Sequence, residues 1–156
     1  MSNNRPTNLY DLMEETAQHI EERPLNYYQG TWATDASLVH IDNPEACGTA
    51  YCRAGWMSAI GMDREVHNDF LIQAYATSLL CKAGISQHDI NSLFNGHAIY
   101  IERSARGQGM CESITDKKYA KSGAQGVRDF MAKHEKKLKR VRLQADAQGV
   151  LQPHVG

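Results

Sequence analysis

Apolar positions recur every three or four residues along most of the chain, which is the spacing of amphipathic helices. The first such stretch, residues 7–23, carries leucine, methionine, alanine and isoleucine on one side and glutamates on the other. Thr7 fits the N-cap of this helix, and Pro24 is expected to end it. The same spacing predicts helices over residues 46–60 and 63–83.

Turn and capping residues separate the helices in the middle of the chain. Asp63 is expected to cap the helix that runs to Ala83, and Gly84 suits the left-handed position that follows a helix. Ser86 fits the N-cap of the next helix because an acidic residue stands three positions later, and Gly96 is expected to close that helix. These signals predict two helices joined by a short turn.

Strand-like patterns are short. Residues 97–101 are β-branched and aromatic and form the best strand candidate, while residues 38–41 are a second extended piece. The last amphipathic segment predicts a helix from Asp116 or Ser122 to about Ala147. We therefore expect a mainly α protein, a compact bundle of about five helices with at most one short strand or hairpin.

The length and composition suit one soluble domain. A chain of 156 residues can bury a core, so we expect a single domain over 1–156, with disordered ends at 1–6 and about 148–156. No apolar run approaches the ~20 residues of a membrane span, and residues 1–6 resemble no secretory signal. Four irregularly spaced cysteines then indicate reduced thiols in a cytoplasmic protein without membrane contact. No phosphate-loop or dinucleotide motif is present, so no cofactor is expected.

Charge is unevenly distributed, although the net charge is only −1. Acidic residues outnumber basic ones over 1–69, whereas basic residues dominate 117–142. This polarity favours an anionic partner, such as a host protein or a nucleic-acid or nucleotide ligand, or assembly into a homo-oligomer. Alternatively, the basic helix is simply solvated, or it packs against the acidic helix 7–23 of its own or a neighbouring chain. The candidate binding residues lie in the last helix and the loop before it: Arg103, Arg106, Arg128, Lys133, Lys136, Lys137, Arg140 and Arg142.

The stretch 46–60 has the most distinctive local pattern. The helix begins either after a cap at Asn43 or at Cys47, and a start at Cys47 would let the helix dipole favour its thiolate. The usual role of such cysteines, however, is that of small buried apolar residues. A stripe of small residues on one side of this helix favours close packing against another element: Gly48, Cys52, Gly55 and Ala59.

Metal binding and cysteine catalysis are the two chemistries that this stretch suggests. Cys47 and Cys52 would point in different directions on a helix instead of forming a zinc knuckle, so no metal is expected. The alternative is a cysteine-dependent hydrolase, in which Cys47 and His97 follow the order seen in papain-like enzymes and Gln29 serves as an oxyanion donor. Helices are predicted where such folds need strands, so this reading depends on whether His97 reaches Cys47.

Two segments together resemble a group of small, uncharacterised bacterial and phage proteins. One is the aromatic turn 27–32, which ends in Trp32, and the other is the Cys-Gly-Thr-x-x-Cys-x-x-Gly motif at 47–55, followed by Trp56. The resemblance covers roughly residues 7–95 and implies no catalytic residues. It implies a non-enzymatic binding protein of phage or mobile-element type, which would act in the host cytoplasm. Such a protein would be an inhibitor, counter-defence or regulatory protein that engages a host macromolecule or an anionic ligand through its basic C-terminal helix.

Overall fold

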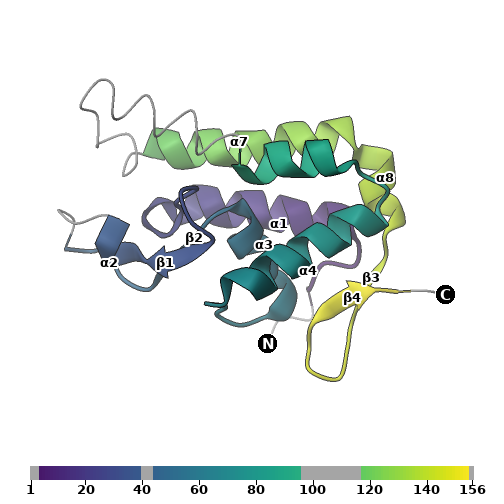
Figure 1. Cartoon of the computed structure of the whole chain (residues 1–156), viewed down its shortest axis with the longest axis horizontal. Helices are drawn as coiled ribbons and strands as arrows, with labels where there is room; N and C mark the ends of the chain where they lie inside the picture. Colours follow the sequence, from purple (N-terminus) through teal and green to yellow (C-terminus); the bar gives the residue numbers. More distant parts are fainter. Residues whose placement is uncertain (1–3, 40–43, 96–116, 155–156) are drawn as a thin grey trace.

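Helices α1 (Leu9–Glu22) and α7 (Lys117–Lys133) lie side by side along the long axis of the molecule (Figure 1). The computed structural model describes residues 4–39, 44–95 and 117–154. Helix α3 (Arg53–Met62) packs against α1, and α4 (Asp69–Lys82) packs against α3. The mainly helical class predicted from the sequence is therefore confirmed.

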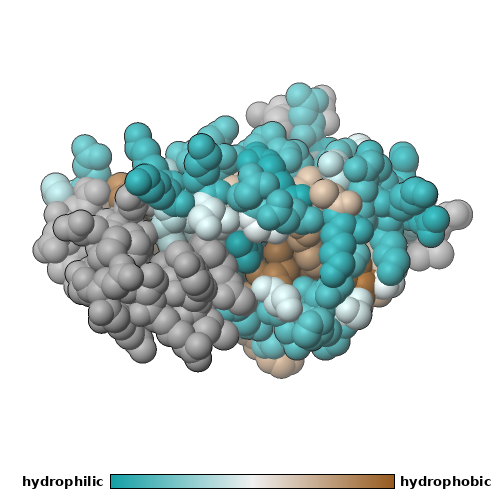
Figure 2. Space-filling view, turned by 90° about the horizontal axis from the view of Figure 1, so that it is seen from above, coloured by the Kyte–Doolittle hydropathy of each residue, from teal (hydrophilic) through white to brown (hydrophobic). Residues whose placement is uncertain are grey.

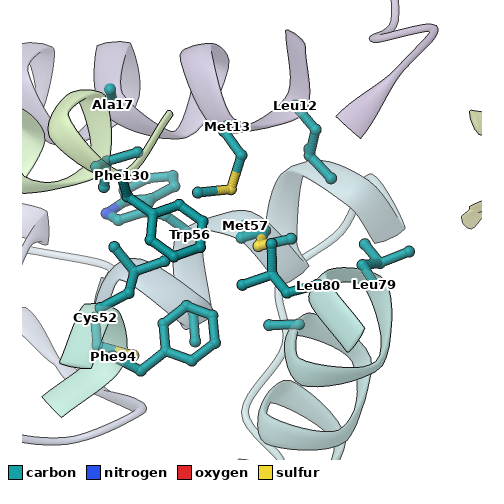
Figure 3. Packing of buried hydrophobic residues seen from close by; sticks show 14 of the residues in the cluster. Leu12, Met13, Ala17, Cys52, Trp56, Met57, Leu79, Leu80, Phe94 and Phe130 are labelled. Atoms are coloured by element: carbon teal, nitrogen blue, oxygen red, sulfur yellow. The ribbon is translucent and has the colours of Figure 1, made fainter. Parts of the chain in front are cut away.

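The apolar core fills the space between these helices. Buried leucine, methionine and aromatic side chains each contribute about 2 kcal/mol when they leave water. At its centre, side chains from α1, α3, α4, helix 87–95 and α7 pack together (Figure 3): Leu12, Met13, Ala17, Trp56, Met57, Leu79, Leu80, Phe94 and Phe130.

Helix α1 confirms the prediction for residues 7–23, except at its cap. The Asn8 side chain accepts a hydrogen bond from the Asp11 amide at 2.8 Å and so caps the helix. Thr7 instead accepts a backbone hydrogen bond from Leu143 at 2.9 Å, next to the β-bridge between Asn8 and Arg142. A single turn of 3₁₀ helix, η1 (Pro24–Asn26), follows α1.

The prediction of a continuous helix over 46–60 is wrong in its first half. Strand β2 (Thr49–Tyr51) pairs antiparallel with β1 (Ala33–Asp35), so these residues are extended. Cys52 is the N-cap of α3, and its Sγ accepts a hydrogen bond from the Gly55 amide at 3.3 Å. The small-residue stripe is therefore divided between a loop, a cap and a shorter helix.

The helix predicted over 63–83 is also divided. Asp63 has a φ of 55° and ends α3 in the left-handed conformation instead of starting a helix. Helix α4 begins only after Asn68, whose side chain accepts a hydrogen bond from the Leu71 amide. At the other end, Gly84 has a φ of 81°, which confirms its predicted role after the helix.

The next helix, 87–95, has the predicted cap. The Asp89 amide donates to Ser86 Oγ at 3.2 Å. Gly96 and the strand predicted over 97–101 lie outside the described residues. The extended piece predicted over 38–41 is wrong for its first two residues, because they belong to α2 (Ala36–Val39).

The last helix is shorter than predicted. Helix α7 ends at Lys133, His134 interrupts the helical geometry, and α8 (Glu135–Arg140) follows. Beyond α8 the chain is extended, and strands β3 (Leu143–Ala145) and β4 (Leu151–Pro153) form a hairpin. The helical segment therefore ends at Arg140 and not at about Ala147, because residues 143–153 form the hairpin.

Residues 4–6 and the turn of this hairpin have defined positions in the fold, although disorder was expected over residues 1–6 and about 148–156. The Asp146 carboxylate accepts hydrogen bonds from two turn amides, and Gly149 supplies a φ of 81°. Arg5 donates to the carbonyls of Gly61 and Gly149, and so joins α3 to the hairpin. Two small two-stranded sheets thus accompany the helices, where at most one hairpin was predicted.

Candidate functional site

The two segments that carry the family resemblance lie against each other. The Tyr28 amide donates to Tyr51 O at 3.0 Å, and the Cys52 amide donates to Trp32 O at 3.3 Å. A Cβ at Gly55 would stand 2.4 Å from Trp32 O, so only glycine permits this approach. The aromatic turn and the cysteine–glycine motif, which are distant in sequence, are therefore joined through their backbones.

Gln29 is the centre of a buried polar cluster at this junction. Its Oε1 accepts hydrogen bonds from the Arg53 amide at 2.9 Å and from the Tyr27 hydroxyl at 3.1 Å. Its Nε2 donates to Phe94 O, and its amide donates to the Tyr119 hydroxyl at 3.0 Å. Both polar ends of this side chain make hydrogen bonds inside the protein. We call Tyr27, Gln29, Arg53 and Tyr119 the buried hub.

Arg53 places a buried guanidinium between three helices. Only 5% of the residue is exposed, its Nε donates to Gly123 O at 3.0 Å, and its Nη1 donates to Leu93 O at 2.7 Å. Within the described ranges, no carboxylate lies within 4 Å of it. A Cβ at Gly126 would stand 2.0 Å from Nη2, and one at Gly123 would stand 2.5 Å from the Tyr27 ring. Arg53 is not among the residues singled out from the sequence, and the helical Gly126 is the signal that points to it.

The described residues cover only part of the hydrolase alternative, which needs Cys47 close to His97. Cys52 is buried, and burial raises the pKa of its thiol to about 12, so it is protonated at neutral pH. Cys47 is exposed, but it precedes a strand and not a helix. The helix dipole that was expected to favour its thiolate is therefore missing at this position. His97 and Cys111 lie outside the described residues. In the part of the chain that the structure describes, no three His, Cys, Asp or Glu side chains are placed to hold a metal ion.

Arg128, one of the predicted binding residues, is held by the acidic helix of its own chain. Its guanidinium pairs with Glu14, at 3.2 Å, and with Glu21. All three side chains are about two-thirds buried, which makes this a network and not an isolated surface pair. The alternative in which the basic helix packs on the acidic helix 7–23 therefore describes Arg128, which is not free to contact a partner.

Lys133 is also paired, whereas four of the five lysines and arginines that follow it have no ion pair within the described part of the chain. Its ammonium lies 3.2 Å from Asp89 Oδ2, and this hydrogen bond holds the pKa of Asp89 below its usual value. Lys139 pairs with Glu135 at 2.9 Å, but the other four cations are exposed, and among the described residues none of these four has a carboxylate within 4 Å. We call these four the basic face: Lys136, Lys137, Arg140 and Arg142. Arg103 and Arg106 lie outside the described residues.

An open cavity of about 620 Å³ lies on another side, beside Trp56. His19 stacks on the Trp56 ring at 5.3 Å and the Arg23 guanidinium covers it at 5.9 Å, so little of the indole is open. Glu15 also lines the cavity, and burial raises the pKa of its carboxyl above the usual value. The nearby Arg5 is already occupied by backbone carbonyls. With charges of both signs on its walls, this cavity favours no single class of ligand.

Comparison with other proteins leaves these features to be interpreted from their own geometry. Among the described residues, no helix combines the length and the apolar character that crossing a membrane requires. No family model, no curated protein and no solved structure matches this chain.

Proposed function

We propose that this protein is a non-enzymatic binding protein that contacts an anionic macromolecule through the basic face. The observation that carries the proposal is the difference among the lysines and arginines of residues 128–142. Arg128, Lys133 and Lys139 each have a carboxylate partner within 4 Å. The four residues of the basic face have none in the described part of the chain.

Clustered like charges repel each other, and an anionic partner would relieve that repulsion. Three of the four cations lie on α8, which has six residues and is therefore about 9 Å long. Lys137 Nζ also donates to Gly84 O at 3.2 Å, which holds α8 near the end of α4. The face is thus small, fixed and positively charged, and suits a phosphate backbone or an acidic protein surface.

The two kinds of partner differ in how binding depends on salt. Lysine and arginine contacts to phosphate release condensed counterions, so affinity falls as salt rises. For duplex DNA, each lost contact makes the slope of log affinity against log salt less negative by about 0.9. Binding to a single acidic protein surface depends less steeply on salt, since fewer ions are released. The inhibitory or counter-defence role, which comes from the resemblance alone, requires that the partner be a host component.

The test is a double charge reversal, Lys136→Glu with Arg140→Glu. Lys117→Glu with Lys121→Glu is the matched control, because it changes the net charge equally at the far end of α7. Fluorescence anisotropy with a short DNA duplex, a short RNA duplex and polyglutamate measures binding at two salt concentrations. Capture from bacterial lysate by each protein tests for a host partner. The proposal expects loss of binding in the α8 pair alone; equal loss in both pairs, or no binding by the unaltered protein, contradicts it.

A further inference from the structure

A hollow of about 300 Å³ opens between α7 and helix 87–95. Figure 2 views the molecule from above α7 and shows an apolar hollow bordered by hydrophilic residues on this side. Asp89, Asp129 and Lys133 also border it. We call it the Arg53 pocket, after one of the residues that line it: Arg53, Ser92, Leu93, Gly126, Phe130 and His134.

The first observation is the state of the Arg53 guanidinium. A guanidinium has five N–H donors, and the carbonyls of Gly123 and Leu93 together with the Tyr27 hydroxyl account for three of them. A buried cation without an acidic partner is costly, because carbonyls replace only part of the stabilisation that water or an anion provides. Gly126 leaves Nη2 uncovered by any side chain at that position of α7.

The second observation is His134, at the break between α7 and α8. The residue is 9% exposed, and its Nε2 is buried without a hydrogen-bond partner among the described residues. Asp89 Oδ2 lies 3.2 Å away but outside hydrogen-bond geometry, and Phe130 stacks on the ring at 4.7 Å. A buried ring nitrogen of this kind is normally satisfied, so its position in the pocket indicates a missing polar group.

We propose that the Arg53 pocket binds a small oxyanion, a carboxylate or a phosphate group, between Arg53 and His134. The planar guanidinium matches two oxygens of either group, and His134 donates to a third position from Nε2–H, which its neutral tautomer also carries. Lys133 adds positive charge at the rim. This proposal does not depend on the basic face.

The rim also sets the strength of binding. Asp89 Oδ2 lies 3.2 Å from both Lys133 Nζ and His134 Nε2, so its negative charge stands beside the pocket and is offset in part by Lys133. Asp129 is exposed and accepts a hydrogen bond from Gln125 at 2.9 Å, and no cation of the described residues lies within 4 Å of it, so its charge also opposes an incoming anion. Removing its charge is therefore expected to strengthen binding, an effect that a purely structural Arg53 would not produce.

The experiment uses the full chain, with inorganic phosphate and acetate titrated separately at constant ionic strength and with chloride as the reference. Backbone amide NMR shifts of Gly126 and Leu93 report occupancy, and the imidazole signals of His134 report its protonation. Comparing the two titrations shows whether phosphate or carboxylate is preferred.

Two exposed positions give variants that keep the fold. Asp129→Asn is expected to raise affinity about fivefold, as expected for removal of one nearby charge, whereas Asp69→Asn, which does not line the pocket, is the control with the same change in charge. Ser92→Trp fills the hollow and is expected to abolish the anion-specific shifts. Shifts no larger than those with chloride, shifts that persist in Ser92→Trp, or equal affinities for Asp129→Asn and Asp69→Asn would each overturn the proposal.

Discussion

The guanidinium of Arg53 fills the space that a side chain at Gly126 would need. A Cβ at position 126 would stand 2.0 Å from Nη2 and 2.8 Å from Cζ. Arg53 cannot simply move aside, because Gly123 O and Leu93 O hold it. Helix α7 thus keeps a residue that costs about 1 kcal/mol in a helix interior in order to accommodate this contact.

Replacing Gly126 by alanine is therefore expected to destabilise the protein, although alanine is the better helix former. Displacing the anchored guanidinium is expected to lower the free energy of unfolding by about 2 kcal/mol, as in other overpacked cores. Ser122→Ala, on the exposed side of the same helix, is the control and should raise it by about 0.5 kcal/mol. Urea denaturation followed by circular dichroism measures both, and stabilisation of both variants would contradict the prediction.

Substitution of Gln29 should lower the free energy of unfolding more than substitution of an exposed glutamine. Gln29→Leu keeps the approximate size but leaves the Arg53 amide, the Tyr27 hydroxyl and Phe94 O without this partner. Unsatisfied buried groups cost about 1–3 kcal/mol each, so we expect a loss of at least about 2 kcal/mol in the free energy of unfolding. The exposed Gln73→Leu is the control, and similar denaturation midpoints for the two variants would count against the buried hub.

The cysteines are expected to differ in reactivity. Cys47 and Cys81 are exposed, while Cys52 is 2% exposed with a thiol pKa raised to about 12 by burial. In the native protein, a maleimide reagent should label Cys47 and Cys81 as fast as it labels any exposed thiol. Cys52 should stay unlabelled until denaturant is added. Mass spectrometry of peptides from pulse-labelled protein identifies each site. Rapid native labelling of Cys52 would show that its cap on α3 opens readily.

Stability should decrease as the pH falls below about 6.5, partly because of His134. Burial lowers the pKa of this imidazole below 6.5, against the attraction of Asp89 and with repulsion from Lys133 and Lys137. The unfolded chain then takes up a proton at a higher pH than the folded one, so stability present above about pH 6.5 is lost as the pH falls through the lowered pKa. His134→Gln should flatten this part of the profile, and the exposed His67→Gln should not. Urea midpoints measured between about pH 8 and about pH 5 provide the comparison.

Arg128 is expected to affect stability and not binding. Arg128→Gln breaks contacts with Glu14 and Glu21 and should lower the free energy of unfolding by about 1 kcal/mol, as is usual for a partly exposed network. Anisotropy with the probes used for the basic face should be unchanged. Lys121→Gln is a control with the same loss of charge and no expected effect on stability. Loss of binding without loss of stability in Arg128→Gln would contradict this prediction and show that Arg128 contacts the partner.

Elements whose signals are local could be predicted from the sequence. The stripe and the acidic face of α1, the left-handed Gly84 and the Ser86 cap depend on residues within one or two helical turns. Each of them appears at or next to its predicted position. The shift of the α1 cap to Asn8 came from a partner near the other end of the chain, the Leu143 amide.

Elements that depend on distant partners could not be predicted. Residues 49–51 have helical spacing, yet they pair with β1 and become a strand because that pairing satisfies their backbone. The basic residues look equivalent in sequence, but in the fold Arg128 pairs with Glu14 of α1 and Lys133 pairs with Asp89. The buried guanidinium of Arg53 depends on glycines in α7, which lie far along the chain.

The contact between α1 and the C-terminal elements has a consequence for how the protein is made. Glu14 and Arg128 are 114 residues apart, and Thr7 and Leu143 join the two ends of the described chain. During translation, the apolar side of α1 therefore leaves the ribosome long before α7 exists to cover it. Such long-range closure slows folding and leaves apolar surface open to chaperones or to other nascent chains. Completion of the core is thus a late event, which begins only when the second half of the chain has emerged.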